Sequence, residues 1–243
     1  MLILAIDTTG ATLSAALLED QTIRAEVFVN TGANHSLHLL PAIKHVYDQA
    51  GAGTESTDLF VCTLGPGSFT GVRIGVSTIK GLAMATGKPV VGISTLEAVA
   101  ANVGANSGII CPILDAQRGQ IYTALFQQSD DLVPQLIQEA RLTDLEPFIS
   151  ALRDKVLCTG PGALKYADLI KSTRPECEIA AAQFAPVRAS VVGLLGLMKF
   201  QAGENLDVRT FAPLYLRLSE AERKLNMAER GEHKEVDKRA NLI

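Results

Sequence analysis

Apolar and polar positions form two kinds of pattern along the chain, which are short apolar runs and longer amphipathic segments. In the first half, the short runs predict β-strands and the longer segments predict helices between the later strands. Turn residues such as Glu19 and Asp20 join the early strands directly, as is typical of hairpins. This order predicts a mixed sheet with helices on its faces. The predicted strands cover 2–7, 13–18, 23–29, 58–64 and 89–94, and the predicted helices lie near 34–50, 68–86 and 95–103.

The second half repeats the same order of elements. Two local echoes support a duplication: VCTLGPG (61–67) matches LCTGPG (157–162), and AIDTTGATLSAALL (5–18) resembles ILDAQRGQIYTALF (113–126). We therefore predict an α/β protein of two similar lobes, each with a mixed five-stranded sheet and flanking helices, with a cleft between the lobes. Strands are predicted at 109–116, 120–126, near 132–141, 155–160 and 177–181, and helices at 144–153, 163–172 and 188–202.

The Gly- and Asn-rich stretch 101–108 predicts the boundary between the lobes. The expected division is an N-terminal lobe at 1–104 and a C-terminal lobe at 105–218. Beyond this point charged residues dominate and apolar anchors are sparse, so 219–243 is predicted to be a flexible tail.

Composition narrows the function classes. The 243 residues carry a net charge of −4, which argues against a chain whose own surface holds an RNA or DNA backbone. No apolar run is long enough to span a membrane, and MLILAIDTTG lacks the basic region of a signal peptide, so we expect a cytoplasmic protein. The cysteines form no CxxC pair and lie mostly within apolar runs, which indicates buried reduced thiols. They are Cys62, Cys111, Cys158 and Cys177.

The stretch Asp7-Thr8-Thr9-Gly10 ends the first predicted strand and turns tightly into the second. In a two-lobed nucleotide-binding fold, backbone N–H groups and hydroxyls at this place would meet phosphate, with the Asp carboxylate organising Mg²⁺. An ordinary hairpin turn is the stronger interpretation of these four residues alone, because Asp, Thr and Gly favour such turns in any case.

The segment LGPGSFTGVRIG (64–75) begins a predicted helix with an unusual amount of glycine. It is not a P-loop, because no Gly-Lys-Ser/Thr closes it, and it lacks the third glycine of a dinucleotide fingerprint. Gly67, Gly71 and Gly75 recur at every fourth residue and so form one stripe on a helix. Close approach of another protein segment is the favoured explanation of this stripe, and a phosphate cradle is the second.

Helix 68–86 is apolar on more than one side, with Arg73 and Lys80 its only charged residues. One apolar stripe is needed for the sheet, so a second one indicates a neighbouring helix such as 34–50 or a subunit interface.

Three of the four histidines, His35, His38 and His45, lie on one predicted helix, where only Asp48 could complete a metal ligand set. We expect solvated or capping roles for them and no metal site. No Ser–His–Asp or Cys–His pattern with a nucleophile-elbow signature is present, so we expect no catalytic residue in this chain.

Together these motifs resemble the TsaB family, also called YeaZ, up to about Arg217. The resemblance implies an actin-like, ASKHA-type fold of two duplicated lobes. It also implies a role in making N6-threonylcarbamoyladenosine, or t6A, at position 37 of tRNAs that read ANN codons. One departure is Gln117, where many relatives have a second Arg. The segments that carry the resemblance are 5–17, 35–43, 64–83, 92–98, 115–122 and 213–217.

The resemblance also implies that this chain is a non-catalytic subunit. The related catalytic protein TsaD carries an Asn-His-x-Glu-Gly-His metal motif, and Thr95 and Val99 occupy the places of its two histidines here. A hydroxyl is a poor metal ligand and an isopropyl group is none. We therefore expect no intrinsic cofactor, with ATP or ADP bound, if at all, by the complex, and tRNA contacted only through the complex.

The partners implied by the resemblance are TsaD in a heterodimer, TsaE in a ternary complex, and a second copy of this chain when TsaD is absent. Two helices of the N-terminal lobe would form the interface. The expected interface residues are Leu39, Leu40, Ile43, Val46 and Tyr47 from helix 34–50, and Gly67, Phe69, Gly71, Val72, Gly75 and Ile79 from helix 68–86.

Two other functions stay open at the level of sequence. The first is an autonomous ATP-dependent phosphotransferase of the same superfamily, with Asp7, Thr8 and Thr9 at the nucleotide phosphates. The second is a metal-dependent glycoprotease, which the missing histidines disfavour.

Overall fold

The computed structural model describes residues 1–30, 32, 34–104, 108–127 and 133–217. The predicted tail at 219–243 lies outside the described residues. The first half of the chain forms β1 (Leu2–Asp7), β2 (Thr12–Glu19), β3 (Thr22–Asn30), α1 (His35–Ala50), η1 (Thr54–Ser56), β4 (Leu59–Gly65), α2 (Phe69–Thr86), β5 (Val90–Ser94) and α3 (Thr95–Ala101).

The second half of the chain forms a similar series of elements. These are β6 (Ile109–Asp115), β7 (Gln120–Gln127), β8 (Gln135–Asp144), α4 (Leu145–Ala151), β9 (Val156–Thr159), α5 (Pro161–Lys165), α6 (Ala167–Thr173), β10 (Glu178–Ile179), η2 (Ala182–Phe184) and α7 (Ala189–Gln201).

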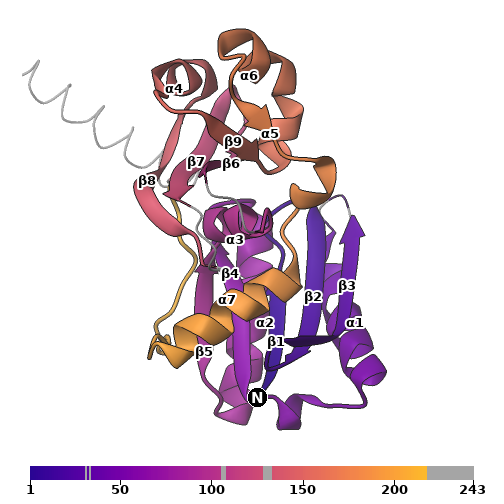
Figure 1. The fold of residues 1–243 in the computed structure, drawn as a ribbon. Helices are drawn as coiled ribbons and strands as arrows, with labels where there is room; N and C mark the ends of the chain where they lie inside the picture. Colours follow the sequence, from indigo (N-terminus) through magenta and orange to yellow (C-terminus); the bar gives the residue numbers. More distant parts are fainter. Residues whose placement is uncertain (31, 33, 105–107, 128–132, 218–243) are drawn as a thin grey trace, which may run out of the picture.

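Two five-stranded sheets with the same topology confirm the predicted duplication and fold class (Figure 1). Their strand orders are β3-β2-β1-β4-β5 and β8-β7-β6-β9-β10. In the first sheet β1 runs antiparallel to β2, with Asp7 opposite Ser14, and parallel to β4. In the second, β6 runs antiparallel to β7 and parallel to β9. Asp7 and Asp115 therefore end equivalent strands.

Two predicted elements of the second lobe differ from the structure. The helix expected at 163–172 is divided at Tyr166, whose backbone leaves the helical region and whose hydroxyl bonds to Asp115. The strand expected at 177–181 has only two residues, paired with β9. The prediction for the cysteines is confirmed in that all four thiols are buried.

Both faces of the first sheet are covered by helices, and the covering helix on one face comes from the far end of the chain. Helices α1 and α2 pack on one face, and α7 packs on the other (Figure 1). A Cβ on Gly193 would lie 2.5 Å from the Leu18 side chain, and one on Gly196 would lie 2.5 Å from Val61. The two glycines of α7 thus allow it to lie very close to the sheet.

The predicted division at residue 104 falls between the two sheets and stays a prediction, because the packing crosses it. Helix α7 packs on the first sheet. Helix α3 lies between the lobes and packs against β4 and β5 of the first sheet as well as against β6 and β7 of the second. The segment after α7 also returns to the first lobe, where Leu206 pairs with Val90 and Phe211 is buried in the core. The first lobe is thus completed by a helix from the second half of the chain, and both lobes share α3.

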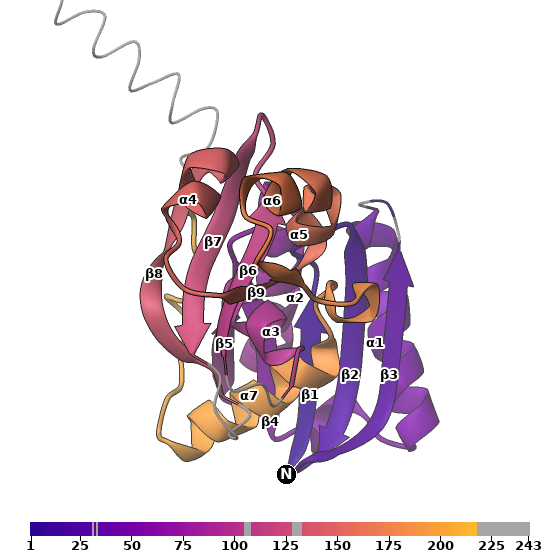
Figure 2. The same cartoon turned by 45° about the horizontal axis from the view of Figure 1, so that its top comes forward.

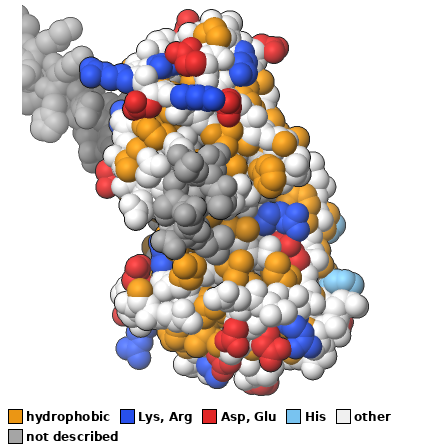
Figure 3. Space-filling model, in the orientation of Figure 1, with side chains coloured by type: hydrophobic (Ala, Val, Ile, Leu, Met, Phe, Trp, Pro, Cys, Tyr) orange, Lys and Arg blue, Asp and Glu red, His pale blue; other side chains and the backbone are white. Residues whose placement is uncertain are grey.

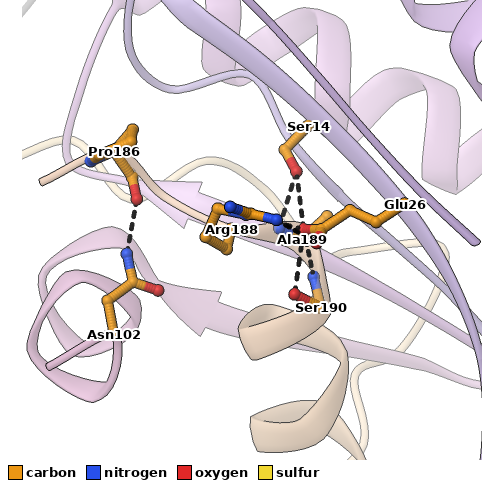
Figure 4. Close-up of polar contacts among 7 residues, drawn as sticks. All are labelled: Ser14, Glu26, Asn102, Pro186, Arg188, Ala189 and Ser190. Carbon is orange, nitrogen blue, oxygen red and sulfur yellow. Dashed lines mark hydrogen bonds and ion pairs between the residues drawn. The ribbon is translucent and has the colours of Figure 1, made fainter. Parts of the chain in front are cut away.

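A group of polar contacts fixes the chain where it enters α7 (Figure 4). The Glu26 carboxylate on β3 accepts hydrogen bonds from Arg188 Nη2 at 2.6 Å and from the Ser190 N–H at 3.1 Å. Ser14 Oγ accepts one from the Ala189 N–H at 2.8 Å. Beside this group, Asn102 Nδ2 donates to the Pro186 carbonyl at 2.5 Å, which joins the two segments that connect the lobes on this side.

Candidate functional site

A cavity of about 1220 Å³ lies between the lobes, at the carboxyl ends of β1 and β6. In α/β proteins this edge of a sheet is where ligands most often bind. The lining includes Asp7 and Thr95 from the first half and Asp115 and Tyr122 from the second. The predicted cleft between the lobes is therefore present, and its chemistry depends on which polar atoms are free.

Asp7 is the buried carboxylate of this cavity. Its Oδ1 atom accepts hydrogen bonds from the Thr63 hydroxyl at 2.6 Å, the Thr9 hydroxyl at 2.7 Å and the Thr9 N–H at 3.2 Å. Oδ2 has no hydrogen-bond partner among the described residues. Burial raises the pKa of Asp7 above its usual range, although the bonds from Thr63 and Thr9 act in the opposite direction.

The threonines after Asp7 are engaged within the protein. The Thr8 hydroxyl donates to the Gly71 carbonyl at 2.7 Å, and Thr8 does not line the cavity. The Thr9 hydroxyl donates to Asp7, and the Thr9 carbonyl accepts from the Ser68 N–H at 2.7 Å. The expected phosphate contact is therefore wrong for Thr8, because its hydroxyl is buried against α2. Asp7 and Thr9 do face the cavity.

The glycine stripe of α2 packs against these same threonines. A Cβ on Gly67 would lie 2.4 Å from the Thr9 carbonyl oxygen, one on Gly71 2.0 Å from the Thr8 carbonyl oxygen, and one on Gly75 2.5 Å from the Thr8 hydroxyl. Real Cβ atoms do not approach other atoms so closely. The close approach that the spacing predicted is real, but it occurs within the chain, and the expected seam with a partner through these glycines is corrected accordingly.

The pKa of Asp115, the counterpart of Asp7 in the second lobe, is shifted in the opposite direction. Burial opposes its ionisation, but hydrogen bonds from Lys165 at 2.5 Å, Tyr166 at 2.9 Å and the Gln117 N–H outweigh it, so the pKa of Asp115 is lowered. Gln117 and Arg118 form a left-handed turn beside it, with φ of 65° and 56°. The cleft thus contains one ion-paired carboxylate and one without a cation.

The resemblance implied that Thr95 and Val99 occupy the places of two metal-binding histidines, and neither side chain fits a metal. Both are buried, and the Thr95 hydroxyl has no hydrogen-bond partner among the described residues. In the part of the chain that the structure describes, no group of three or more His, Cys, Asp or Glu side chains could hold a metal ion. His35 corrects the expectation of solvated histidines, because it is buried and bonds to the Gly10 carbonyl at 2.9 Å.

The helical face of the first lobe differs from the predicted interface. Of the expected residues outside the glycine stripe, only Leu40 and Phe69 are exposed, at 60% and 37%. Leu37 and Met84, which the prediction left out, are exposed at 69% and 63%. The other expected residues are buried in the core between the helices and the sheet, where other residues of this chain cover them. They are Leu39, Ile43, Val46, Tyr47, Val72 and Ile79.

The comparisons with known structures agree with the duplicated fold. YeaZ from Pseudomonas aeruginosa superposes with a TM-score of 0.76 at 23% identity, over 88% of this chain and 99% of that one. A ROK hexokinase from Thermus thermophilus matches with a TM-score of 0.50 at 13% identity, over 84% of this chain and all of that one. The fold, two duplicated lobes with a cleft between them, is of the actin-like ASKHA type.

The sequence comparisons narrow this class to one family. The family model of TsaD, tRNA N6-adenosine threonylcarbamoyltransferase, matches residues 27–225. The tRNA threonylcarbamoyladenosine biosynthesis protein TsaB of Bacillus subtilis is 37% identical over 229 residues, which is 92% of this chain and 97% of that protein. TsaB of Escherichia coli is 28% identical over 93% of this chain and 98% of that protein. The chain belongs to the TsaB family.

Proposed function

We propose that this chain is a non-catalytic subunit in the biosynthesis of t6A in tRNA, and that it pairs with TsaD through the exposed side of α1 and α2. Membership of the TsaB family, whose members are named for this biosynthesis, supports the pathway. The observation that carries the partner role is the set of large apolar side chains left exposed on α1 and α2. These side chains are Leu37, Leu40, Phe69 and Met84.

The state of the cleft supports a role without catalysis. Thr95 and Val99 stand where the related transferase has metal ligands, and Lys165 neutralises Asp115. The Thr8 hydroxyl, expected at a nucleotide phosphate in the phosphotransferase alternative, is bonded to Gly71. These contacts favour the partner role over an autonomous phosphotransferase.

The rest of the proposed assembly follows from the same reasoning. TsaE joins the pair as a third component, and a second copy of this chain occupies the same helical face when TsaD is absent. On the face in Figure 3, acidic and basic side chains are interspersed, with hydrophobic side chains at the waist between the lobes. Such a surface lacks the clustered positive charge that holds an RNA backbone. We propose that tRNA, and ATP or ADP, are bound through the complex.

A charge introduced on the helical face tests this proposal. Leu40→Asp should weaken binding to TsaD from the same organism by at least about tenfold, because a carboxylate would have to be desolvated at the contact. The matched control is Ile137→Asp on β8, a position of the second lobe that is also exposed, at 51%. Binding is measured by calorimetry, and t6A formation by mass spectrometry of tRNA in a reconstituted reaction.

Normal TsaD binding and normal t6A formation by a folded Leu40→Asp variant would contradict the proposal. Rapid ATP hydrolysis by the isolated chain that is lost in Asp7→Ala would instead support the phosphotransferase. Melting temperatures of each variant exclude a loss of fold as the cause.

A further inference from the structure

The segment Leu206–Arg217 runs from the first lobe to the second beside the interlobe cavity. It begins at the Leu206 bridge to Val90, and its last four residues line the cavity. Within these four residues the contacts change from one lobe to the other. The chain also passes between the lobes through α3, which lies between β5 and β6, and through 180–188.

Leu214 and Tyr215 are attached to the first lobe. The Leu214 N–H donates to the Leu64 carbonyl at 2.7 Å. The Tyr215 ring lies 4.9 Å from the Phe69 ring, and Arg73 Nε donates to the Tyr215 hydroxyl at 2.8 Å. The Arg73 guanidinium also lies 4.0 Å above the Phe69 ring, so it joins both aromatic side chains. Tyr215 is thereby fixed to the start of α2.

Leu216 and Arg217 are attached to the second lobe. Leu216 packs against the core cluster that contains Ala116 and Tyr122. Arg217 Nη1 donates to the Ala116 carbonyl at 2.9 Å, and Nη2 donates to Gln120 Oε1. Both acceptors flank the turn between β6 and β7. Hydrogen bonds from a charged guanidinium are among the stronger ones in proteins.

The connection 180–188 lies on the opposite side of the molecule. In both Figure 1 and Figure 2, the segment 206–217 and the segment 180–188 stand on opposite sides of the gap between the sheets. Segments 182–187 and 214–217 nevertheless line the same cavity. Asn102, directly after α3, donates to the Pro186 carbonyl on the far side. The lobes are therefore linked there by α3 and 180–188, and on the other side by the C-terminal segment.

We propose that Tyr215 and Arg217 form a clasp that holds the two lobes closed over the interlobe cavity. Helix α3, which packs against both sheets, can serve as the pivot between the lobes, and closing about it requires an attachment on the opposite side. Arg217 provides the contacts to the second lobe there, and release of Arg217 would remove them and open the cavity. The clasp does not depend on the partner proposed above.

The distance between the lobes tests the clasp directly. Cysteines introduced at Ser77 on α2 and Glu146 on α4, both exposed, carry spin labels, and the four native thiols are buried and stay unlabelled. In Arg217→Ala the distance distribution should shift to longer values and broaden. Tyr215→Phe, which keeps the ring but loses the bond to Arg73, should give a smaller shift.

Two further variants make the result decisive. Arg209→Ala, in the same segment, is the matched control, because the hydrogen bonds of Arg209 with Lys80 and Asp207 are made by its backbone. Its distance distribution should equal that of the parent protein. Gln120→Ala removes an acceptor of Arg217 without changing the segment, and it should reproduce the shift even if Arg217→Ala fails to fold. An unchanged distribution in folded Arg217→Ala, or in Gln120→Ala where the former does not fold, would overturn the clasp.

Discussion

Burial of the Asp7 carboxylate lowers the stability of the folded protein. Three donors, two from Thr9 and one from Thr63, converge on Oδ1, while the buried Oδ2 has no hydrogen-bond partner among the described residues. Because burial penalises the charged form, the folded protein retains a proton on Asp7 at a pH where the unfolded chain has lost it. Stability therefore falls as the pH rises from the ordinary pKa of 3.8 through the raised one.

Asp7→Asn should raise the melting temperature at neutral pH. The amide oxygen can accept the bonds from Thr63 and Thr9, and the buried charge is removed. For a chain of this size, each kcal/mol gained corresponds to about 2–4 °C. The gain should shrink as the pH falls and vanish below 3.8, where Asp7 itself is protonated in both states. Calorimetric melting over a pH series measures this.

A lower melting temperature for Asp7→Asn at neutral pH would contradict this account. It would mean that the ionised carboxylate makes a favourable interaction that the structure does not contain.

The pair Asp7 and Asp115 also shows what the sequence could not predict at this scale. The echo between 5–18 and 113–126 correctly indicated an Asp at the end of equivalent strands. The echo did not indicate that Lys165 and Tyr166, some 50 residues further along the chain, would form hydrogen bonds with Asp115 and not with Asp7. Ion pairs between distant segments depend on tertiary structure and have no local pattern.

The sequence pattern of helix α2 correctly predicted a close neighbour but did not identify that neighbour. Glycines at every fourth residue required a close neighbour, and one exists. Periodicity defines the sides of a helix but does not identify what covers each side. The apolar side chains assigned to a partner were therefore mostly those that form the core, and Leu37 and Met84 on the open side were missed. Both could have been found as apolar residues opposite the buried stripe.

Two alanine substitutions in α2 should change stability in opposite directions. Gly71→Ala places a Cβ 2.0 Å from the Thr8 carbonyl oxygen, so the backbone must shift, at a cost of about 1–3 kcal/mol that exceeds the gain in helix propensity. Gly81→Ala meets nothing within 4 Å and should stabilise the helix by about 1 kcal/mol. Urea unfolding of both variants gives the two free energies. Equal free energies for the two variants would show that the turn after β1 is not tightly packed.

At the scale of the whole molecule, the two lobes are repeats whose packing crosses from one half of the chain to the other, with α7 on the first sheet and α3 shared by both lobes. No pattern in the sequence distinguished a helix that covers its own sheet from one that covers the other, because both need the same apolar residues. Helix α7, ASVVGLLGLMKFQ, is apolar almost all round and gave no indication of which sheet it meets. In the described part of the chain, no helix is long and apolar enough to cross a membrane.

Residues 1–104 expressed alone should fail to form a stable lobe. Without α7, the face of the first sheet that carries Ile3, Ala5 and Val61 would be open to water. Each large side chain left exposed forfeits about 1.5–3 kcal/mol of burial, and the total approaches the stability of a whole domain. Circular dichroism and amide exchange of this fragment test the prediction. Co-expression with 105–243 should restore the fold, whereas a fragment with sharp, cooperative melting on its own would contradict it.

The position of α7 in the chain also has a consequence during synthesis. The last strand of the first sheet, β5, ends at Ser94, whereas α7 ends at Gln201. A ribosome adds about 5–20 residues per second, so it needs roughly 5–20 s to make the intervening chain. Throughout that interval the nascent sheet presents an uncovered apolar face in a crowded cell, where such surfaces aggregate or recruit chaperones. Because α7 covers the first sheet from the second half of the chain, the growing polypeptide depends on protection until α7 has emerged.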